Sequence, residues 1–357
     1  MPVRGDLTEM SGYHSPQVEA AVRLNTNESP FAPPAEWLAE FTKELASVQF
    51  NRYPDRGAKG LREAIGDVHG VESERVFCAN GSNEVLQSLL LAYGGPGRKA
   101  AVFEPTYAMH RQIAAVTSTE VVSARRGADH LLDVSTLDAF LGEHRPEITF
   151  LCSPNNPTGR VEPPSTISRV LDSSTGLVVV DEAYGQFAPT SALELQGAAG
   201  SDTKRIVVVR TFSKTWAMAA CRLGYLIADP SVVAACELVA LPYHLDAVKQ
   251  LAGRLALRYE DAMTVRIAAL SEERDRIAAA FSELPVQTWQ SDANFLLFRP
   301  LQRDAKEVWE NLLEASVLVR DCSTWPGLDN CLRVTVGTRE ENDLFLGALR
   351  VSLQEDR

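Results

Sequence analysis

The group in this chain most suited to covalent chemistry is a lysine with a small hydroxyl residue before it and an arginine eight residues after it. Lys214 follows Ser213 and precedes Arg222, and the apolar run 206–209 predicts a buried strand just ahead of it. Open α/β sheets bind ligands at such strand ends. Of the seven lysines, Lys214 is the one among small and apolar residues, where desolvation would lower its pKa and favour a Schiff-base nucleophile. The segment alone is equally compatible with an ammonium in water.

A second strand end predicts an anion site. Ser82 and Asn83 follow the apolar run 76–78 and open a helix, so their side chains and backbone N–H groups would meet an anion at a helix N-terminus. Taken alone, an ordinary helix N-cap explains this loop better. Ser213 and Arg222 could add a hydroxyl and a guanidinium to the same site, and the separate donors together favour a phosphate.

A carboxylate leaves the apolar run 177–180, and a phenol follows three residues later. These residues are Asp181 and Tyr184. A buried carboxylate must be paired to stay ionised. A protonated pyridine nitrogen would be such a partner, and the aspartate would then hold that ring as an electron sink. The alternative is an aspartate that caps the following helix.

Two more strand ends present an amide and an aromatic ring. Asn156 lies in a turn fixed by prolines after the run 148–152, and Tyr107 follows the run 101–103. The ring could stack on a planar cofactor. A plain turn and a core tyrosine are the alternatives for the two residues.

The elements that must position these groups alternate along the chain. Between about residues 60 and 230, continuous apolar runs separated by helical segments predict an α/β fold with a mostly parallel sheet covered on both faces. From about 231 to 283 the pattern is helical and charged, as on one long helix that could link two domains. The tail alternates again and predicts a small α+β unit of about a hundred residues.

We therefore expect three regions. Residues 1–40, rich in Pro and Asn, predict an extended arm that packs on the small unit or on a partner subunit. Residues 41–245 would form the large ligand-binding domain. Residues 246–357 would form the linking helix and the small domain.

Composition narrows the choice of partner. Acidic residues outnumber basic ones by 47 to 35, and the net charge of −12 without any Lys/Arg-rich run argues against nucleic acid and anionic membranes. The six cysteines show no CxxC pair, so we expect neither disulfides nor zinc. The start of the chain has no apolar signal region, and no stretch approaches about 18 apolar residues. We expect a cytoplasmic protein that acts on small molecules.

Three motifs, in this order along the chain, resemble the fold-type I pyridoxal-phosphate aminotransferases. They are 153–159 (SPNNPTG), 180–184 (VDEAY) and 213–225, and the resemblance runs from about residue 23 to 340. Within this family the chain is most similar to the histidinol-phosphate aminotransferases, on four supporting segments: 23–30, 52–56, 241–245 and 317–320. The resemblance implies a seven-stranded, mostly parallel sheet, pyridoxal 5'-phosphate as cofactor, and a homodimer with shared active sites.

The resemblance also implies roles for single residues. Lys214 would hold the cofactor as a Schiff base, Asp181 would pair with its pyridine nitrogen, and Tyr107 would stack on the ring. Asn156 and Tyr184 would bond the ring's phenolic oxygen. The residues implied for the cofactor phosphate are Ser82, Asn83, Ser213, Arg222 and, from the neighbouring subunit, Tyr53. The residues implied for the substrate are Arg333, Arg320, Tyr13 and Asn27.

The reaction that the resemblance implies is transamination of L-histidinol phosphate with 2-oxoglutarate, a step of histidine biosynthesis. An aromatic amino acid aminotransferase, a lyase like the threonine-phosphate decarboxylases, and a non-catalytic protein of the same fold are the alternatives. Arg320 could also form a surface ion pair. Ser29, Ala32 and Asn83 differ from the residues usual in the family. These departures remove no group that the chemistry needs, but they leave the choice of substrate open.

Overall fold

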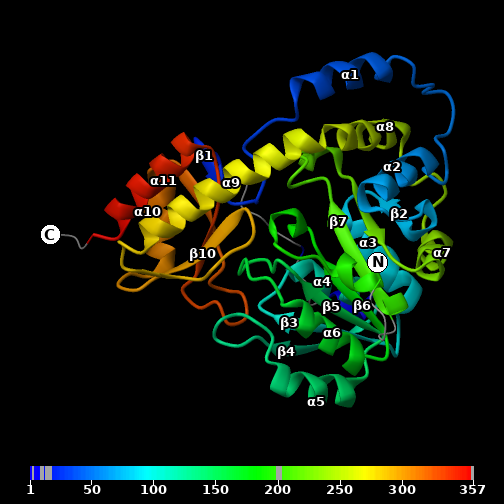
Figure 1. Cartoon of the computed structure of the whole chain (residues 1–357). Coiled ribbons are helices and arrows are strands. Elements are labelled where there is room, and N and C mark those ends of the chain that lie inside the picture. Colours follow the sequence, from blue (N-terminus) through cyan, green and yellow to red (C-terminus); the bar gives the residue numbers. More distant parts are fainter. Residues whose placement is uncertain (2–3, 9–11, 13–17, 198–202, 355–357) are drawn as a thin grey trace.

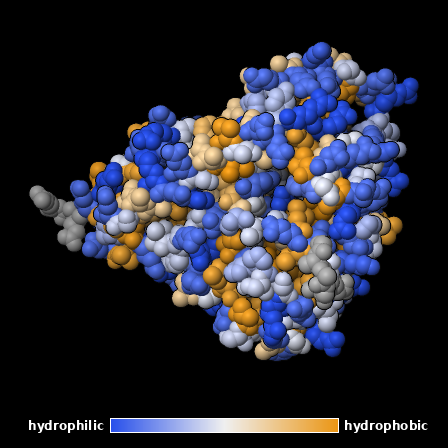
Figure 2. Space-filling model, in the orientation of Figure 1, coloured by the Kyte–Doolittle hydropathy of each residue, from blue (hydrophilic) through white to orange (hydrophobic). Residues whose placement is uncertain are grey.

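The strands of this chain form two sheets, which a long helix connects. The computed structural model describes residues 1, 4–8, 12, 18–197 and 203–354. One sheet has seven strands and the other has five, and α9 (Glu260–Phe281) runs from the side of the larger sheet to the side of the smaller one (Figure 1). The face seen in Figure 2 carries small, separate hydrophobic patches among hydrophilic residues. Within the described residues, no helix is both long and apolar enough to cross a membrane.

The seven-stranded sheet is mostly parallel, as predicted. Its strand order is β2-β8-β7-β6-β5-β3-β4, and only β8 runs antiparallel to its neighbours. The central strands are buried along their whole length because helices cover both faces of the sheet, which explains their continuous apolar sequences. The strands are β2 (Val76–Ala79), β3 (Lys99–Glu104), β4 (Glu120–Arg125), β5 (Ile148–Cys152), β6 (Leu177–Asp181), β7 (Ile206–Thr211) and β8 (Gly224–Ile227).

Helices pack on the two faces of this sheet in separate hydrophobic clusters. One face is covered by α3 (Ser82–Tyr93), α4 (Ala108–Val116) and α7 (Pro230–Val239). The other face is covered by α2 (Lys59–His69), α5 (Val134–His144), α6 (Pro164–Ser173) and α8 (Ala247–Ala256), and α1 (Ala35–Leu45) packs on α8. In α3 the apolar residues Val85, Leu86, Leu89 and Leu90 form one stripe at helical spacing, which is why this helix buries a single face.

The five-stranded sheet has its own core. Its strand order is β1-β11-β12-β10-β9, and Phe281, Phe298 and Phe345 pack together between it and its helices. The strands are β1 (Val22–Leu24), β9 (Val286–Thr288), β10 (Phe295–Pro300), β11 (Val317–Asp321) and β12 (Leu332–Thr335). Besides α9, its helices are α10 (Ala305–Glu314) and α11 (Arg339–Ser352), and a Thr338–Glu341 capping box begins α11.

Two expectations about secondary structure were wrong. The stretch 231–283 is not one helix: α7 ends at Val239, Asp246 caps the start of α8, and a 3-10 turn at Leu257–Tyr259 separates α8 from α9. The end of the first forty residues is helical rather than extended. β1 pairs in parallel with β11, and α1 begins at Ala35. The bounds of the three predicted regions stay a prediction.

The topology gathers the chemically important residues at one edge of the larger sheet. The parallel strands β2, β3, β5, β6 and β7 all end at this edge, and the antiparallel β8 begins there. The segments that follow these five parallel strands therefore meet at this edge, together with the segment that precedes β8. Open α/β sheets bind ligands at such an edge.

Candidate active site

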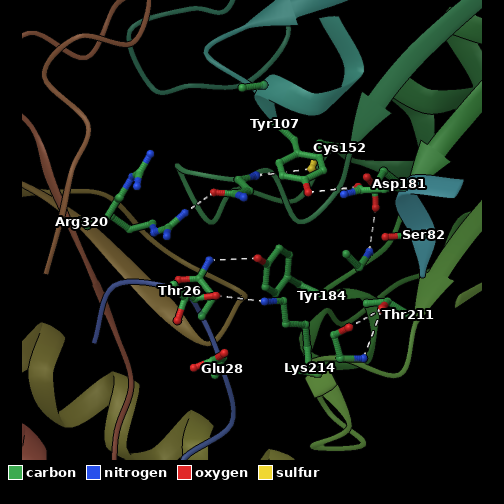
Figure 3. A pocket seen from close by; sticks show the side chains of 18 of the residues that line it. Thr26, Glu28, Ser82, Tyr107, Cys152, Asp181, Tyr184, Thr211, Lys214 and Arg320 are labelled. Atoms are coloured by element: carbon green, nitrogen blue, oxygen red, sulfur yellow. Dashed lines mark hydrogen bonds between the residues drawn. The ribbon is translucent and has the colours of Figure 1, made fainter. Parts of the chain in front are cut away.

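A pocket of about 420 Å³ lies at this edge. Residues of the larger sheet line one part of it, and the segment after β1 together with residues of β11 and β12 lines the rest. The structure brings nearly all the predicted site residues into this pocket: Ser82, Asn83, Tyr107, Asn156, Asp181, Tyr184, Ser213, Lys214, Arg222, Asn27, Arg320 and Arg333. Figure 3 shows Lys214 and Tyr184 between Ser82 on one side and Arg320 on the other.

Lys214 is half-buried, and its ammonium is poorly stabilised by its surroundings. Its Nζ donates a 3.1 Å hydrogen bond to the carbonyl oxygen of Thr26 and lies 5.8 Å from the centre of the Tyr184 ring. Burial lowers the pKa of Lys214 to about 7, and the positive charges of Arg333 and Arg222 act in the same direction, against the opposing charge of Glu28. Near neutral pH a large fraction of the molecules therefore carries Lys214 as a neutral amine.

The anion side of the pocket is built from the N-terminus of α3 and the turn after β7. Gly81 precedes α3 with a φ of 84°, and a Cβ there would lie 2.9 Å from Nη2 of Arg222. Arg222 also donates a 3.4 Å hydrogen bond to the Ser213 hydroxyl. Thr211 holds Ser213 in place, since its hydroxyl accepts a hydrogen bond from the Ser213 backbone and donates one to the Ser213 side chain. Hydroxyls, a guanidinium and helix N–H groups converge here, as an anion requires.

Asp181 is buried and has a partner that sequence reasoning missed. Its Oδ2 lies 3.0 Å from Nε2 of His110, and its Oδ1 accepts a 3.1 Å hydrogen bond from the backbone of Ala183. His110 is fully buried, and its ring stacks on Phe150 at 4.8 Å. His110 therefore orients the carboxylate without lining the pocket itself, and Asp181 still lines the pocket.

Tyr107 closes one side of the pocket. Its hydroxyl donates a 3.1 Å hydrogen bond to Oδ1 of Asn83, and its ring meets the His110 ring edge to face at 5.5 Å. Asn83 thus orients Tyr107 here, in addition to its predicted role at the phosphate.

Asn156 and Arg333 lie in contact. Nη1 of Arg333 donates to Oδ1 of Asn156, and its Nη2 donates a 2.8 Å hydrogen bond to the carbonyl oxygen of Asn25. Because the amide oxygen of Asn156 is engaged, its NH₂ group is the part that can donate into the pocket. The guanidinium of Arg333 also lies over the ring of Phe295, at 5.2 Å.

Tyr184 is held by the segment that follows β1. Nδ2 of Asn27 donates a 2.9 Å hydrogen bond to the phenol oxygen, and Oδ1 of Asn27 accepts one from Thr335. Burial raises the pKa of the Tyr184 phenol, so the phenol keeps its proton. Since Asn27 already supplies a donor to this oxygen, the phenol hydrogen is available to a ligand.

Arg320 and Arg333 occupy directly opposed positions of the antiparallel strands β11 and β12. Side chains at opposed positions point to the same face of the sheet. The guanidinium of Arg320 lies 5.7 Å from the centre of the Trp325 ring, and both residues line the pocket.

Two predicted site residues are not placed in this pocket. Tyr53 is 81% exposed, does not line the pocket of its own chain, and stacks on Tyr243 at 4.5 Å. Tyr13 lies outside the described residues. The roles implied for both stay predictions.

Three residues that line or support the pocket had no signal in the sequence that could have singled them out. His110 sits in a helix after Tyr107, Thr26 contributes only a carbonyl oxygen, and Trp325 lies in a loop between two strands. His110 and Thr26 reach the site through contacts with residues far away in the chain, and Trp325 reaches it through Arg320, on the strand that precedes its loop. Thr211 was the exception, because a hydroxyl two residues before Ser213 is a visible signal for a turn.

Comparison with known proteins decides the family. The family model "Aminotransferase class I and II" matches residues 19–349. The chain belongs to the class I and II aminotransferases. A curated relative of this aminotransferase, the histidinol-phosphate aminotransferase of Frankia casuarinae, is 43% identical, and the match covers 98% of this chain and 89% of the relative.

Solved structures confirm the fold of the aminotransferase. The histidinol-phosphate aminotransferase of Sinorhizobium meliloti, solved in complex with pyridoxal-5'-phosphate, matches with a TM-score of 0.85 and 22% identity over 94% of this chain and 91% of that one. The L-threonine-O-3-phosphate decarboxylase of Porphyromonas gingivalis matches with a TM-score of 0.80 and 22% identity over 94% and 100%. The predicted fold and enzyme class are thus confirmed, and the fold by itself does not choose the substrate.

Proposed function

We propose that this aminotransferase binds pyridoxal 5'-phosphate in the pocket and transfers the amino group of L-histidinol phosphate to 2-oxoglutarate. The products would be imidazole-acetol phosphate and glutamate, which would make the reaction a step of histidine biosynthesis. The observation that carries the proposal is the position of Lys214 between two separate groups of anion-binding residues (Figure 3). One group suits the phosphate of the cofactor, and the other suits the phosphate of the substrate. The name of the Frankia casuarinae relative supports the donor.

The residues of the pocket fit the cofactor. Gly81 leaves the space beside Arg222 that a Cβ would fill, so an anion can reach the N-terminus of α3. The carboxylate of Asp181 suits a protonated ring nitrogen, and the NH₂ group of Asn156 and the phenol of Tyr184 suit a phenolate oxygen. When bound, pyridoxal phosphate supplies an electron sink for the carbon that loses its proton.

The protein supplies the proton transfer. Lys214, with a pKa of about 7, offers the neutral amine that would hold the carbonyl end of the cofactor, and the same amine, when it is not engaged there, would accept the proton of the substrate's α-carbon. Ser213 and Arg222 hold the phosphate while Lys214 is free. Asp181, fixed by His110, keeps the ring nitrogen protonated.

The two opposed arginines favour a phosphorylated donor. Like charges at directly opposed positions of neighbouring strands repel each other, and an anion between them relieves the repulsion. A phosphate has three oxygens and can accept hydrogen bonds from Arg320 and Arg333 together, whereas one arginine fork already satisfies a carboxylate.

The proposal includes a cytoplasmic homodimer in which Tyr53 reaches the phosphate in the neighbouring subunit. Tyr53 and Tyr243 are exposed and stacked on each other, and Phe50 and Leu241, close to them in the chain, are exposed as well. Exposed aromatic and apolar residues of this kind are typical of protein interfaces.

A panel of amino donors tests the proposed reaction. We expect the highest kcat/KM with L-histidinol phosphate, lower values with phenylalanine and tyrosine, and no turnover without an oxo acid. A large excess of activity with phenylalanine or tyrosine would instead identify an aromatic amino acid aminotransferase. Release of CO2 without an oxo acid would identify a lyase. An absorbance band near the visible edge, lost in Lys214→Ala, tests the cofactor itself.

A further inference from the structure

The loop between β11 and β12 is built around a tryptophan that lines the pocket. It runs from Cys322 to Cys331, and Trp325 lies in its first half. Four backbone hydrogen bonds close the loop into a ring, each joining residues of this short segment: Trp325 to Cys322, Leu328 to Trp325, Cys331 to Leu328 and Cys322 to Cys331, at 2.9 to 3.0 Å. The main chain of the loop is therefore fixed.

A small apolar cluster fixes the side chains of the loop as well. Cys322, Leu328 and Cys331 are fully buried together with Leu297, and Trp325 packs against this cluster. A Cβ built on Gly327 would lie within 4 Å of Nη1 of Arg125, at the end of β4, and of Cδ of Pro105, directly after β3. The loop thus bridges the two sheets at the rim of the pocket, and the indole of Trp325 has a defined position.

The indole of Trp325 contacts the guanidinium of Arg320. The two groups are 5.7 Å apart, a distance typical of a cation–π contact. A guanidinium in contact with a ring of fixed position samples fewer orientations, so its N–H groups are directed more narrowly than those of a free arginine. The apolar ring also removes water from one side of the cation, and this strengthens its attraction for an anion.

We propose that Trp325 is a specificity-determining residue, which orients Arg320 for the phosphate end of the substrate and forms the apolar wall beside it. The inference rests on the proposed function in taking the substrate's anionic end to be a phosphate. Trp325 acts through Arg320, so its contribution is present only for substrates that carry this phosphate. The other tryptophan on the same cluster, Trp289, lies against Arg299 at 5.5 Å but does not line the pocket, and it has no such role.

The test uses the holoenzyme and a matched pair of variants. We expect Trp325→Leu to lower kcat/KM for L-histidinol phosphate about tenfold, mainly through KM, as loss of a partly desolvated cation–π contact predicts. Trp325→Phe should recover most of the loss. For L-histidinol, which lacks the phosphate, Trp325→Leu should change kcat/KM less than about twofold. Trp289→Leu removes an equivalent contact and should lower the melting temperature to a similar extent without changing KM.

A double-mutant cycle distinguishes orientation of Arg320 from a general effect on the fold. In the Arg320→Gln background, Trp325→Leu should cause almost no further loss in kcat/KM. Losses that multiply in the double variant, or equal losses with the phosphorylated and the unphosphorylated donor, would overturn the inference.

Binding of inorganic phosphate to the holoenzyme, measured by calorimetry, separates this inference from the proposed function. If the wild type uses L-histidinol phosphate poorly, the proposed donor is wrong, but the inference still requires that phosphate binds and that Trp325→Leu weakens it several-fold. Absence of phosphate binding to the wild type, or equal affinity in wild type and Trp325→Leu, would refute the role of Trp325.

Discussion

Nδ2 of Asn27 donates a 2.9 Å hydrogen bond to the phenol oxygen of Tyr184, across 157 positions of the chain. The backbone of Asn27 is in the left-handed region, with a φ of 56°. An asparagine tolerates this conformation better than most residues. The contact therefore joins the segment after β1, at a residue with left-handed backbone, to the turn that follows β6. It also determines which way the phenol hydrogen of Tyr184 points.

Removing the side-chain amide of Asn27 should lower the stability of the fold. We expect Asn27→Gly to lower the free energy of unfolding by about 1–3 kcal/mol, because buried hydrogen bonds to Tyr184 and Thr335 are lost. Asn27→Ala removes the same groups but adds a Cβ in the left-handed region, which costs roughly 1 kcal/mol more. Denaturant unfolding of both variants checks this, and equal losses would show that the backbone is not strained.

The lowered pKa of Lys214 predicts a pH dependence of stability in the cofactor-free protein. The folded chain holds this lysine with a pKa of about 7, against an ordinary value of 10.5. Between these two values the unfolded chain binds the proton and the folded chain does not, so the free energy of unfolding rises with pH across this window. Below about pH 7 the cost of the buried charge is present in full.

Lys214→Met provides the matched comparison, because it keeps the length of the side chain without the charge. We expect the variant to be more stable than the wild type by a constant amount below about pH 7, and this excess should shrink as the pH rises toward 10. Melting temperatures of both proteins across this range give the difference directly. A difference that does not change with pH would mean that Lys214 keeps an ordinary pKa.

The pair His110 and Asp181 should be coupled in stability. His110→Phe keeps a ring on Phe150 but removes the nitrogen that meets Oδ2 of Asp181, so we expect a loss of about 1–3 kcal/mol. In the Asp181→Ala background the same change should cost much less, and denaturant unfolding of the four proteins gives the coupling energy. Additive losses would contradict a direct bond between the two side chains.

The start of β8 lies so close to the N-terminus of α3 that one position of β8 requires glycine. A Cβ on Gly224 would collide with the backbone nitrogen of Ser82, so Gly224→Ala should shift the start of α3 and weaken phosphate or cofactor binding at least tenfold. Gly347→Ala in α11 meets no atom within 4 Å and should stabilise the protein by up to about 1 kcal/mol. Calorimetric titration with pyridoxal phosphate tests the loss of binding in Gly224→Ala, and unchanged affinity would disprove it. Denaturant unfolding tests the gain in stability of Gly347→Ala.

Local sequence predicted the parts of the site that follow buried strands. β5, β6 and β7 have continuous apolar sequences, and their ends place Asn156, Asp181 and Lys214 together by topology alone. β4 lacked this signal, because this edge strand has charged residues at both ends and a serine among its few apolar residues. Its sequence pattern is weaker than that of a strand covered on both faces.

Contacts between distant segments could not be predicted in this way. β1 has only three residues, and it becomes a strand because it pairs with β11, almost three hundred positions away. His110 owes its role to Asp181, in a different segment, and no periodicity links the two residues. Trp325 is close to Arg320 in the chain, but no sequence pattern indicates their contact. The break between α8 and α9 was equally hidden, since the charged residues on both sides continue at helical spacing.

The parallel pairing of β1 with β11 has a consequence for the synthesis of the protein. The segment after β1 supplies the carbonyl oxygens of Asn25 and Thr26 and the amide of Asn27 to the pocket, but β1 has no strand to pair with until residues 317–319 have been made. A chain growing on the ribosome can therefore complete the larger sheet, including Lys214 and Asp181, while its earliest residues still await their place. The pocket is complete only after β11 and β12 have been made, so a segment that is synthesised before the larger sheet reaches its native position after it.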